Sequence, residues 1–402
     1  MWNALLKVFW VIRLVMKADG NQQTFCVSGF CLPKDYNQLE MPPGRNKIRV
    51  EISILDILSV NDKDFSISIY AYLGIRWPEP RLLDQSRRNW SKTHTDQLET
   101  PVTLDPAFIS SVWVPNIVVI NVKSFKPLSE MKPQRALWVV SEANDQLGFY
   151  YLQGCVISFY CPMRFDFFPL DSHICSLQLS TSYDNEHVYF SDTVLNDAHM
   201  SRNVVLEYSV QIEKIPDGER TLTQAVIGNF SVSGADLYLR RHKLKYLSMY
   251  FLPSGLFVVV SWVSFLIPPD QVAGRMAMLI TLFLVLVNIF GNVTSSVPNT
   301  EGITAISAWM IVCIFFVFGA LCCYAFLLWK MKPTFYLKKH ERTTETIKSK
   351  HWQRVKYDDR CFIIFPIVFI MFNVAYWAIC LNTPPTKGIS SSQAYKSVLT
   401  EG

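Results

Sequence analysis

Motifs of the common enzyme classes are missing from this sequence. It holds no glycine-rich phosphate loop, no nucleophile elbow and no His-Glu-x-x-His pair, the arrangements that position phosphates, an attacking serine or a catalytic zinc ion. Its histidines, cysteines and acids show no spacing typical of a zinc site. We therefore expect a protein that is not an enzyme and that carries no cofactor and no bound metal.

Charge is also scarce. Charged residues make up 18% of the 402 residues, and the net charge is +5. The basic residues form no stripe with interleaved aromatics, which excludes a typical nucleic-acid surface. Apolar residues make up 50% of the chain and gather in its second part. Residues 20–240 are polar enough for water, whereas residues 245–381 carry long apolar runs that fit membrane lipid.

Four apolar runs are long enough to cross a bilayer, which takes about 17–25 residues. They are Leu244–Ile267, Met276–Val293, Ile303–Trp329 and Cys361–Leu381. The basic segment 330–360 belongs in the cytoplasm by the positive-inside rule, and a charged helix at Glu341–Tyr357 would lead into the last span. Because three spans precede this segment, the polar part lies outside the cell, in a multi-pass protein of the plasma membrane.

The polar part shows the alternation of β-strands. Arg49–Leu58 and Phe65–Ile75 alternate polar and apolar residues, and turn-forming residues separate these and further short runs. This pattern predicts an immunoglobulin-like β-sandwich. Glycosylation sequons begin at Asn89 and Asn229. An oxidising compartment is consistent with pairing of Cys161 with Cys175 and of Cys26 with Cys31.

The second apolar run has a polar stripe. Positions spaced by four and three residues share one helix face. They are Ala277, Thr281, Leu284, Asn288, Gly291 and Ser295, all small or polar except the leucine. Such a stripe must face water or protein, so it predicts either a pore with one apolar constriction or an ordinary bundle interface. Arg275 stands at the cytoplasmic end, either as a ring of charge at a pore mouth or as a snorkelling helix-end residue.

Several motifs point to a known family. The segment from Cys161 to Cys175, with Phe168-Pro169-Leu170-Asp171 inside it, resembles the signature loop of the Cys-loop receptors, which are pentameric ligand-gated ion channels. Trp113-Val114-Pro115-Asn116 and Trp77–Leu82 resemble two more of its motifs, and Ser261–Phe265 matches the end of the first span in glycine and GABA receptors. The resemblance implies a subunit of a homo- or hetero-pentamer with a four-helix transmembrane bundle.

The same resemblance implies chloride as the permeant ion. A gap-free alignment with the glycine-receptor type puts Arg275 on the anion-selective arginine and Leu284 on the gate leucine. Ala273-Gly274 replaces the usual Pro-Ala pair, and a shifted alignment would place Asp270 at the acidic position of cation channels. A cation channel of the same fold and an accessory subunit that is silent alone therefore stay open as alternatives.

Agonists of the family bind between subunits. The matching positions include Tyr72 and Leu152 on one side and Asn121, Tyr183 and Phe230 on the other. Glycine and GABA receptors use arginines to hold the ligand carboxylate, and those positions read Gly74 and Gly154 here, which disfavours a neutral amino acid. The pore sequence also resembles invertebrate receptors gated by protons or zinc. The agonist is thus expected to be an amine, a proton or zinc.

The family also implies residues that couple ligand binding to the membrane helices. They are Asp62, Asp64, Phe168, Pro169, Asp171, Arg241 and Pro298. The organisation that follows has six parts. They are a signal peptide or uncleaved helix at 1–20, an extracellular ligand-binding sandwich at 21–243, three spans at 244–329, the basic loop 330–360, the last span 361–381 and an extracellular tail at 382–402.

Overall fold

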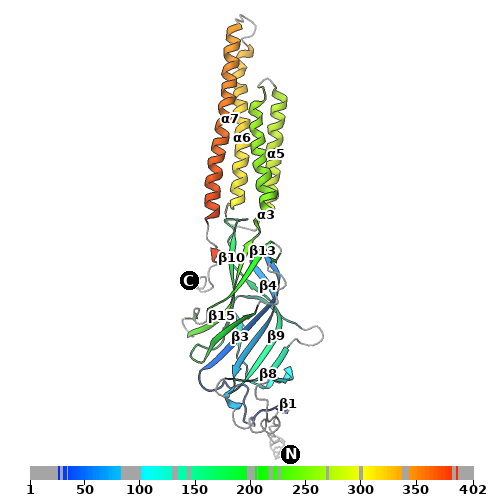
Figure 1. Cartoon of the computed structure of the whole chain (residues 1–402), viewed down its shortest axis with the longest axis vertical. Helices are drawn as coiled ribbons and strands as arrows, with labels where there is room; N and C mark the ends of the chain where they lie inside the picture. The colour runs from blue at the N-terminus through cyan, green and yellow to red at the C-terminus, as the bar shows by residue number, and fades with distance from the viewer. Residues whose placement is uncertain are drawn as a thin grey trace, which may run out of the picture.

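The computed structural model shows a strand-rich domain joined end to end with a bundle of long helices (Figure 1). It describes residues 26–387, apart from gaps at 28–29, 34, 83–100, 129–134, 143–145, 197–203, 206, 217–220, 225–227, 269–270, 298–301, 337–343 and 383–385. The predicted signal peptide, Asp270, Pro298 and the sequon at Asn89 lie outside these residues, as do side-chain details at 330–356.

One sheet of the domain is built around a long hairpin. Its strands run in the order β11-β3-β4-β9-β8-β5, with β7 beside β9. They are β3 (Asn46–Asn61), β4 (Ser66–Pro78), β5 (Val102–Leu104), β7 (Val122–Pro127), β8 (Arg135–Ser141), β9 (Leu147–Tyr160) and β11 (Val188–Asn196).

The second sheet carries the strand that leads into the membrane helices. Its order is β12-β13-β15-β10-β16, with β14 on β15 and β6 on β10. The strands are β6 (Ile117–Val119), β10 (Ser172–Thr181), β12 (Val204–Val205), β13 (Tyr208–Lys214), β14 (Thr221–Gln224), β15 (Gly228–Arg241) and β16 (Thr386–Lys387).

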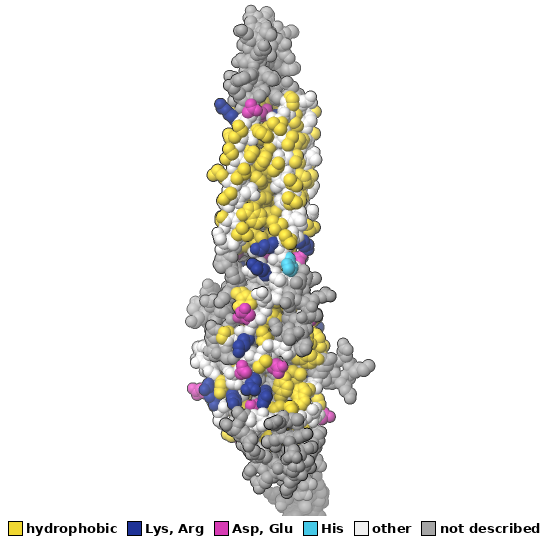
Figure 2. All heavy atoms as spheres, in the orientation of Figure 1, with side chains coloured by type: hydrophobic (Ala, Val, Ile, Leu, Met, Phe, Trp, Pro, Cys, Tyr) yellow, Lys and Arg dark blue, Asp and Glu magenta, His cyan; other side chains and the backbone are white. Residues whose placement is uncertain are grey.

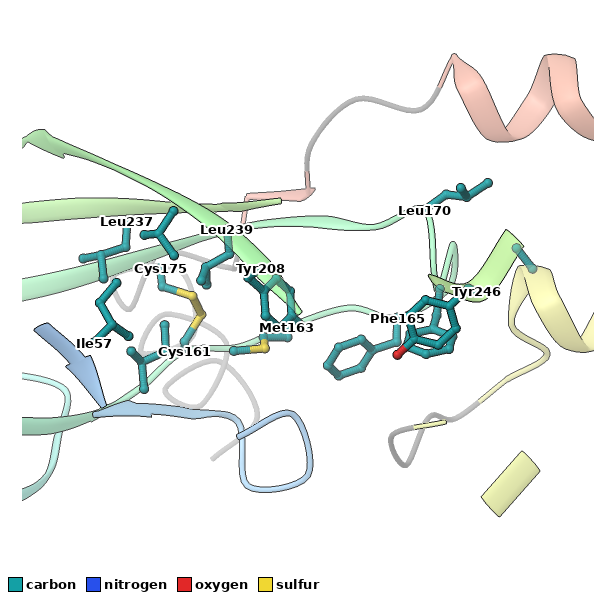
Figure 3. Close-up of a cluster of buried hydrophobic side chains, with 14 of the residues drawn as sticks. Ile57, Cys161, Met163, Phe165, Leu170, Cys175, Tyr208, Leu237, Leu239 and Tyr246 are labelled. Atoms are coloured by element: carbon teal, nitrogen blue, oxygen red, sulfur yellow. A yellow bond between two sulfur atoms is a disulfide. The ribbon is translucent and has the colours of Figure 1, made fainter. Parts of the chain in front are cut away.

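The two sheets pack face to face. Alternate residues of β3, among them Ile48, Ile52 and Ile54, are fully buried and join one core with Leu177 and Leu237 of the other sheet. This period of two is what a strand with one buried face requires. The Cys161–Cys175 disulfide crosses this core, as Figure 3 shows beside Ile57 and Leu237. The predicted sandwich and this predicted disulfide are confirmed.

The N-terminal cysteines lie on a separate short hairpin. β1 (Cys26–Val27) pairs with β2 (Phe30–Cys31), and the register sets Cys26 opposite Cys31. The backbone thus brings the two residues together, while a bond between them stays a prediction. Two 3-10 turns, η1 (Pro80–Leu82) and η2 (Pro106–Ser111), complete this end of the domain around buried Trp77 and Phe108.

Within the described part of the chain, four helices are long and apolar enough to cross a membrane. The first is composite, the next two are α5 and α6, and α7 is the last. The pieces are α3 (Lys243–Tyr246), the π-turn η4 (Leu247–Phe251), α4 (Leu252–Val263), the 3-10 turn η5 (Ser264–Leu266), α5 (Val272–Ser296), α6 (Ala305–Tyr336) and α7 (Thr344–Leu381). α7 includes most of the charged helix predicted before the last span. Figure 2 shows the apolar band formed by the four long helices, with charged side chains at both of its ends.

Aromatic residues hold the first, third and fourth helices together. The Trp309 ring of α6 lies 5.3 Å from both Phe251 and Tyr376, and its Nε1 donates to Ser254 Oγ at 2.9 Å. The Tyr376 hydroxyl of α7 donates to the Ala305 carbonyl at 3.0 Å. Since lipid provides little hydrophobic drive between helices, such packing and hydrogen bonds are what hold a membrane bundle together.

Gly234 permits a close approach of β15 to β10, and its replacement is our first prediction. Its φ is +150°, and a Cβ there would lie 1.9 Å from the Leu177 carbonyl oxygen. Gly234→Ala should therefore lower stability by about 2–4 kcal/mol, measured by thermal unfolding of the solubilised protein. Gly255→Ala in α4, where the nearest atom would lie 3.8 Å away, is the control. Equal melting temperatures for the two variants would contradict this account.

Candidate functional site

A buried arginine stands where the sandwich meets the bundle. Arg241 is the last residue of β15, and its side chain is 1% exposed. Its Nε donates to Asp171 Oδ1 at 3.0 Å, and one terminal nitrogen donates to Asp62 Oδ2 at 2.8 Å. The other donates to Glu207 Oε2 at 3.3 Å. One guanidinium thus joins a hairpin turn, the Cys161–Cys175 loop and the start of β13.

Aromatic rings enclose the same guanidinium. Its carbon lies 4.4 Å from the ring centroid of Tyr208 and 4.7 Å from that of Phe168. The Tyr208 hydroxyl contacts Arg241 and donates to Asp62 Oδ1 at 2.8 Å. Figure 3 shows Phe165 and Tyr246 at this end of the core. Rings exclude water, and their negative faces attract the cation, so the arrangement favours a charged arginine.

The carboxylates keep this arginine charged. Burial acts to lower the pKa of Arg241, but the nearby charges of Asp171 and Asp62 outweigh it and raise that pKa. Burial likewise acts to raise the pKa of Asp171, but the hydrogen bond with His173 (2.6 Å) and the Arg241 charge outweigh it and hold the pKa below its usual value. The junction is therefore a network of ionised side chains around a buried arginine. Removal of one partner there should lower the free energy of unfolding.

The loop closed by the disulfide also docks directly on the third span. The Ala305 N–H donates to the Asp166 carbonyl at 2.9 Å, and the Ile306 N–H donates to the Phe168 carbonyl at 3.1 Å. The first N–H groups of a helix have no partner within it, and here the loop supplies acceptors to two of them. The ring of Phe168 also lies 5.0 Å from that of Tyr246 in α3. Movement of the loop would therefore act on two helices.

Most of the predicted coupling residues meet here. Arg241, Asp62, Asp171 and Phe168 are in contact, and Pro169 is buried beside Phe168. Asp64 does not join them: its carboxylate accepts from Asn61 at 2.9 Å and lies 3.4 Å from Lys123 Nζ, so its coupling role stays a prediction. Glu207 and Tyr208 were missed. They lie at the start of a predicted strand and reach Arg241 only through the pairing of β13 with β15.

The polar stripe of α5 is exposed along its length. Ala277, Thr281, Leu284, Asn288, Gly291 and Ser295 all face outward. Leu279, Leu282, Leu286 and Val293 form the opposite, buried face. Leu284 is 55% exposed. The bundle thus leaves this face uncovered by any described part of the same chain.

Arg275 is not part of this stripe, which corrects the prediction that it lines the pore. It is fully buried, because it shares the inner face with Leu279 and Leu282. Its two terminal nitrogens donate to the two carboxylate oxygens of Asp358 in α7, at 3.0 and 3.1 Å. Asp358 was missed as a partner, although helical spacing places it on one face with the buried Cys361.

Two of the predicted ligand contacts have partners or packing within the domain. The Asn121 side-chain nitrogen donates to the carbonyls of Tyr160 (2.9 Å) and Ser176 (2.8 Å), so its amide ties one sheet to the other. Phe230 is 6% exposed and forms part of the protein interior. Asn229 beside it is exposed, which is compatible with its sequon.

The remaining three predicted contacts lie on two sheets. Tyr72 of β4 pairs with Gly154 of β9, and Leu152 pairs with Gly74, so all four share one face. Tyr183 follows β10, and its ring lies 6.1 Å from that of Trp113.

These features define a class: a multi-pass membrane protein whose β-sandwich docks on four spans and leaves a polar helix face open. Residues 31–241 match the neurotransmitter-gated ion-channel ligand binding domain, and residues 250–339 match the neurotransmitter-gated ion-channel transmembrane region. The chain belongs to this family, the Cys-loop receptors, and is a protein of the plasma membrane.

Curated relatives include subunits named for γ-aminobutyric acid. The mouse "Gamma-aminobutyric acid receptor subunit pi" is 28% identical over 309 residues, which cover 73% of this chain and 64% of the mouse protein. The rat protein of that name shows the same values, and the bovine one is 27% identical over 289 residues, 69% of this chain and 60% of its own. The chain therefore spans less than two thirds of these relatives.

The arginine network predicts unequal roles for two nearby acids. Asp62→Asn removes a half-buried charge that is hydrogen-bonded to Arg241 and should lower stability by about 1.5–3 kcal/mol, read from thermal unfolding of the solubilised protein. Asp64→Asn is the matched control: its carboxylate is 57% exposed and its pair with Lys123 is at the surface, so about 0–1 kcal/mol is expected. A larger loss for Asp64→Asn would refute this arrangement.

The lowered pKa of Asp171 predicts a pH dependence. A carboxyl whose pKa is lower when folded adds stability above its ordinary value of 3.8 and loses it as the pH falls toward the folded value. Asp171→Asn should therefore melt at a lower temperature than the native protein at pH 7, and the gap should narrow below about pH 4. Melting curves from pH 3 to pH 8 measure this. A gap that instead narrows between pH 5 and pH 8 would assign the effect to another group.

Proposed function

We propose that this chain is a subunit of a pentameric ligand-gated channel in which α5 lines the ion pathway. The observation that carries the proposal is the exposed face of α5. Although α5 is apolar enough to span a membrane, this face bears Thr281, Asn288 and Gly291. A polar stripe in lipid must find water or protein, and a ring of identical helices around a water-filled axis provides it. Leu284 then forms the one apolar constriction on the stripe, which closes by dewetting.

The permeant ion in this proposal is chloride. Rings of carboxylates favour cations, and α5 contains no aspartate or glutamate between Val272 and Ser296. The relatives are named as receptors for γ-aminobutyric acid, which agrees with the resemblance of the pore sequence to glycine and GABA receptors. The alternative acid, Asp270, is outside the residues that the structure describes.

The agonist in this proposal is an amine that binds between subunits and not an amino acid. A carboxylate ligand needs a cationic partner in a dry site. The sheet face that carries Tyr72 and Leu152 has glycine at the two positions where glycine and GABA receptors carry arginine. At Gly74 an added Cβ would lie 2.8 Å from the Tyr150 hydroxyl, so that space is filled. Arg76 is bound to Glu142 and to the Ser141 carbonyl. Tyr72 and Tyr183 are partly exposed and suit cation–π binding of an amine.

Two electrical measurements test the proposal. The chain is expressed alone in oocytes and challenged with primary and quaternary amines, zinc chloride, pH steps and γ-aminobutyric acid. We expect an amine-gated current whose reversal potential shifts by about 59 mV per tenfold change in external chloride, the value for one charge. A potential that follows sodium would refute anion conduction. No current alone, with a changed current when a partner subunit is added, would make the chain an accessory subunit.

Thiol labelling tests the pore face directly. Thr281→Cys should react with a water-soluble thiol reagent and lose current, because the stripe faces water. Leu282→Cys is the matched control, since that neighbour is 9% exposed and lies on the packed face. Equal reaction at both positions, measured against the unmodified chain with its native cysteines, would contradict the orientation of α5.

A further inference from the structure

The contacts of Arg275 make it part of an ionic unit inside the bundle. Its guanidinium makes two hydrogen bonds to Asp358, whose side chain is 7% exposed, while that of Arg275 is wholly buried. The guanidinium carbon also lies 4.2 Å from the ring centroid of Tyr324 and 5.6 Å from that of Phe265. Planar, two-point pairing of this kind fixes the arginine in one orientation.

The Arg275–Asp358 pair lies on the side of α5 that faces away from the proposed ion pathway. An α-helix turns about 100° per residue, so Leu284, nine residues beyond Arg275, lies about 180° around the helix. Thr281 and Asn288 lie on the far side as well, and all three are exposed. The guanidinium therefore points into the bundle, toward α6 and α7, while permeating ions would pass on the opposite side of α5.

The net charge of the pair is zero. An ion outside a dry ion pair meets a dipole, whose field falls off faster with distance than that of a single charge. Removal of only one partner would leave an unpaired charge in the protein, which either stays there or turns toward water. In both cases each subunit would gain a full charge near the inner end of α5, where five copies would act together.

The geometry points to Asp358 as the positioning residue of the pore helix: it holds and neutralises Arg275, so that the arginine charge is not what selects the permeant ion. α5 is then anchored at its inner end to the last span, and its exposed stripe stays uncharged. This inference rests on the proposed function, because it concerns the ion preference of the same helix.

Three variants test it by current recording with the agonist found for the native channel. The double variant Arg275→Gln with Asp358→Asn removes both charges and should keep the chloride-to-sodium permeability ratio within about twofold of the native value, since the pair adds no net charge. Asp358→Asn alone should raise the unitary chloride conductance about twofold or more at low ionic strength and less at high ionic strength, because salt screens the freed charge. Asp359→Asn is the matched control, because that neighbour is exposed.

The outcomes separate this inference from the proposed function. A native channel that carries sodium or no current counts against the proposed function. Where the native channel carries chloride, loss of chloride preference in the double variant would overturn the inference, as would an Asp358→Asn channel identical to Asp359→Asn.

Surface labelling decides the remaining case, in which a variant gives no current. If Asp358→Asn fails to reach the surface while the double variant succeeds, the inference is supported, because only the single change leaves a buried charge unpaired. Failure of both would overturn it.

Discussion

A single buried guanidinium holds together the membrane end of the sandwich, at the point where the chain enters the first span. Arg241 ends the strand that leads into the first span, and it bonds at once to the turn of a hairpin, to the disulfide-closed loop and to the start of β13. A buried arginine of this kind must keep its partners, since the energy lost with one of them is larger than that of an exposed pair. The three elements at the membrane end of the sandwich therefore have to move together or break a costly contact.

A second buried pair stands at the other end of the bundle. Arg275 and Asp358 join α5 to α7, while the disulfide-closed loop and the aromatic residues around Trp309 hold the outer ends of the first, third and fourth helices. α5 is packed along one face and open along the other. This is the arrangement expected of a helix that completes its surroundings with copies of itself, and it gives the open face a reason to be polar in a membrane.

Much of this could be predicted from local patterns. Alternation in Arg49–Leu58 identifies a strand with one buried face, and the lengths of the four apolar runs identify the spans. The stripe at Thr281, Leu284 and Asn288 was predicted as one face and is exposed as one face. The wrong assignment of Arg275 to the pore face could have been avoided. Ala277 follows Arg275 by two residues, which corresponds to about 200° around the helix and places the two side chains on different sides. A family alignment assigns a position but not a direction.

The sequence by itself determined the class of protein, the place of the lipid-embedded part and the polar face of α5, because periodicity and the length of apolar runs are properties of neighbouring residues. Only the tertiary structure decided which acids neutralise the two buried arginines. Asp171 was among the candidates for Arg241, but Glu207 and Asp358 come from segments that meet their partners through strand pairing and helix packing. A charge pair depends on distance in space, and residues 34 or 83 positions apart in the chain carry no mutual signal until the fold brings them within 3.3 Å.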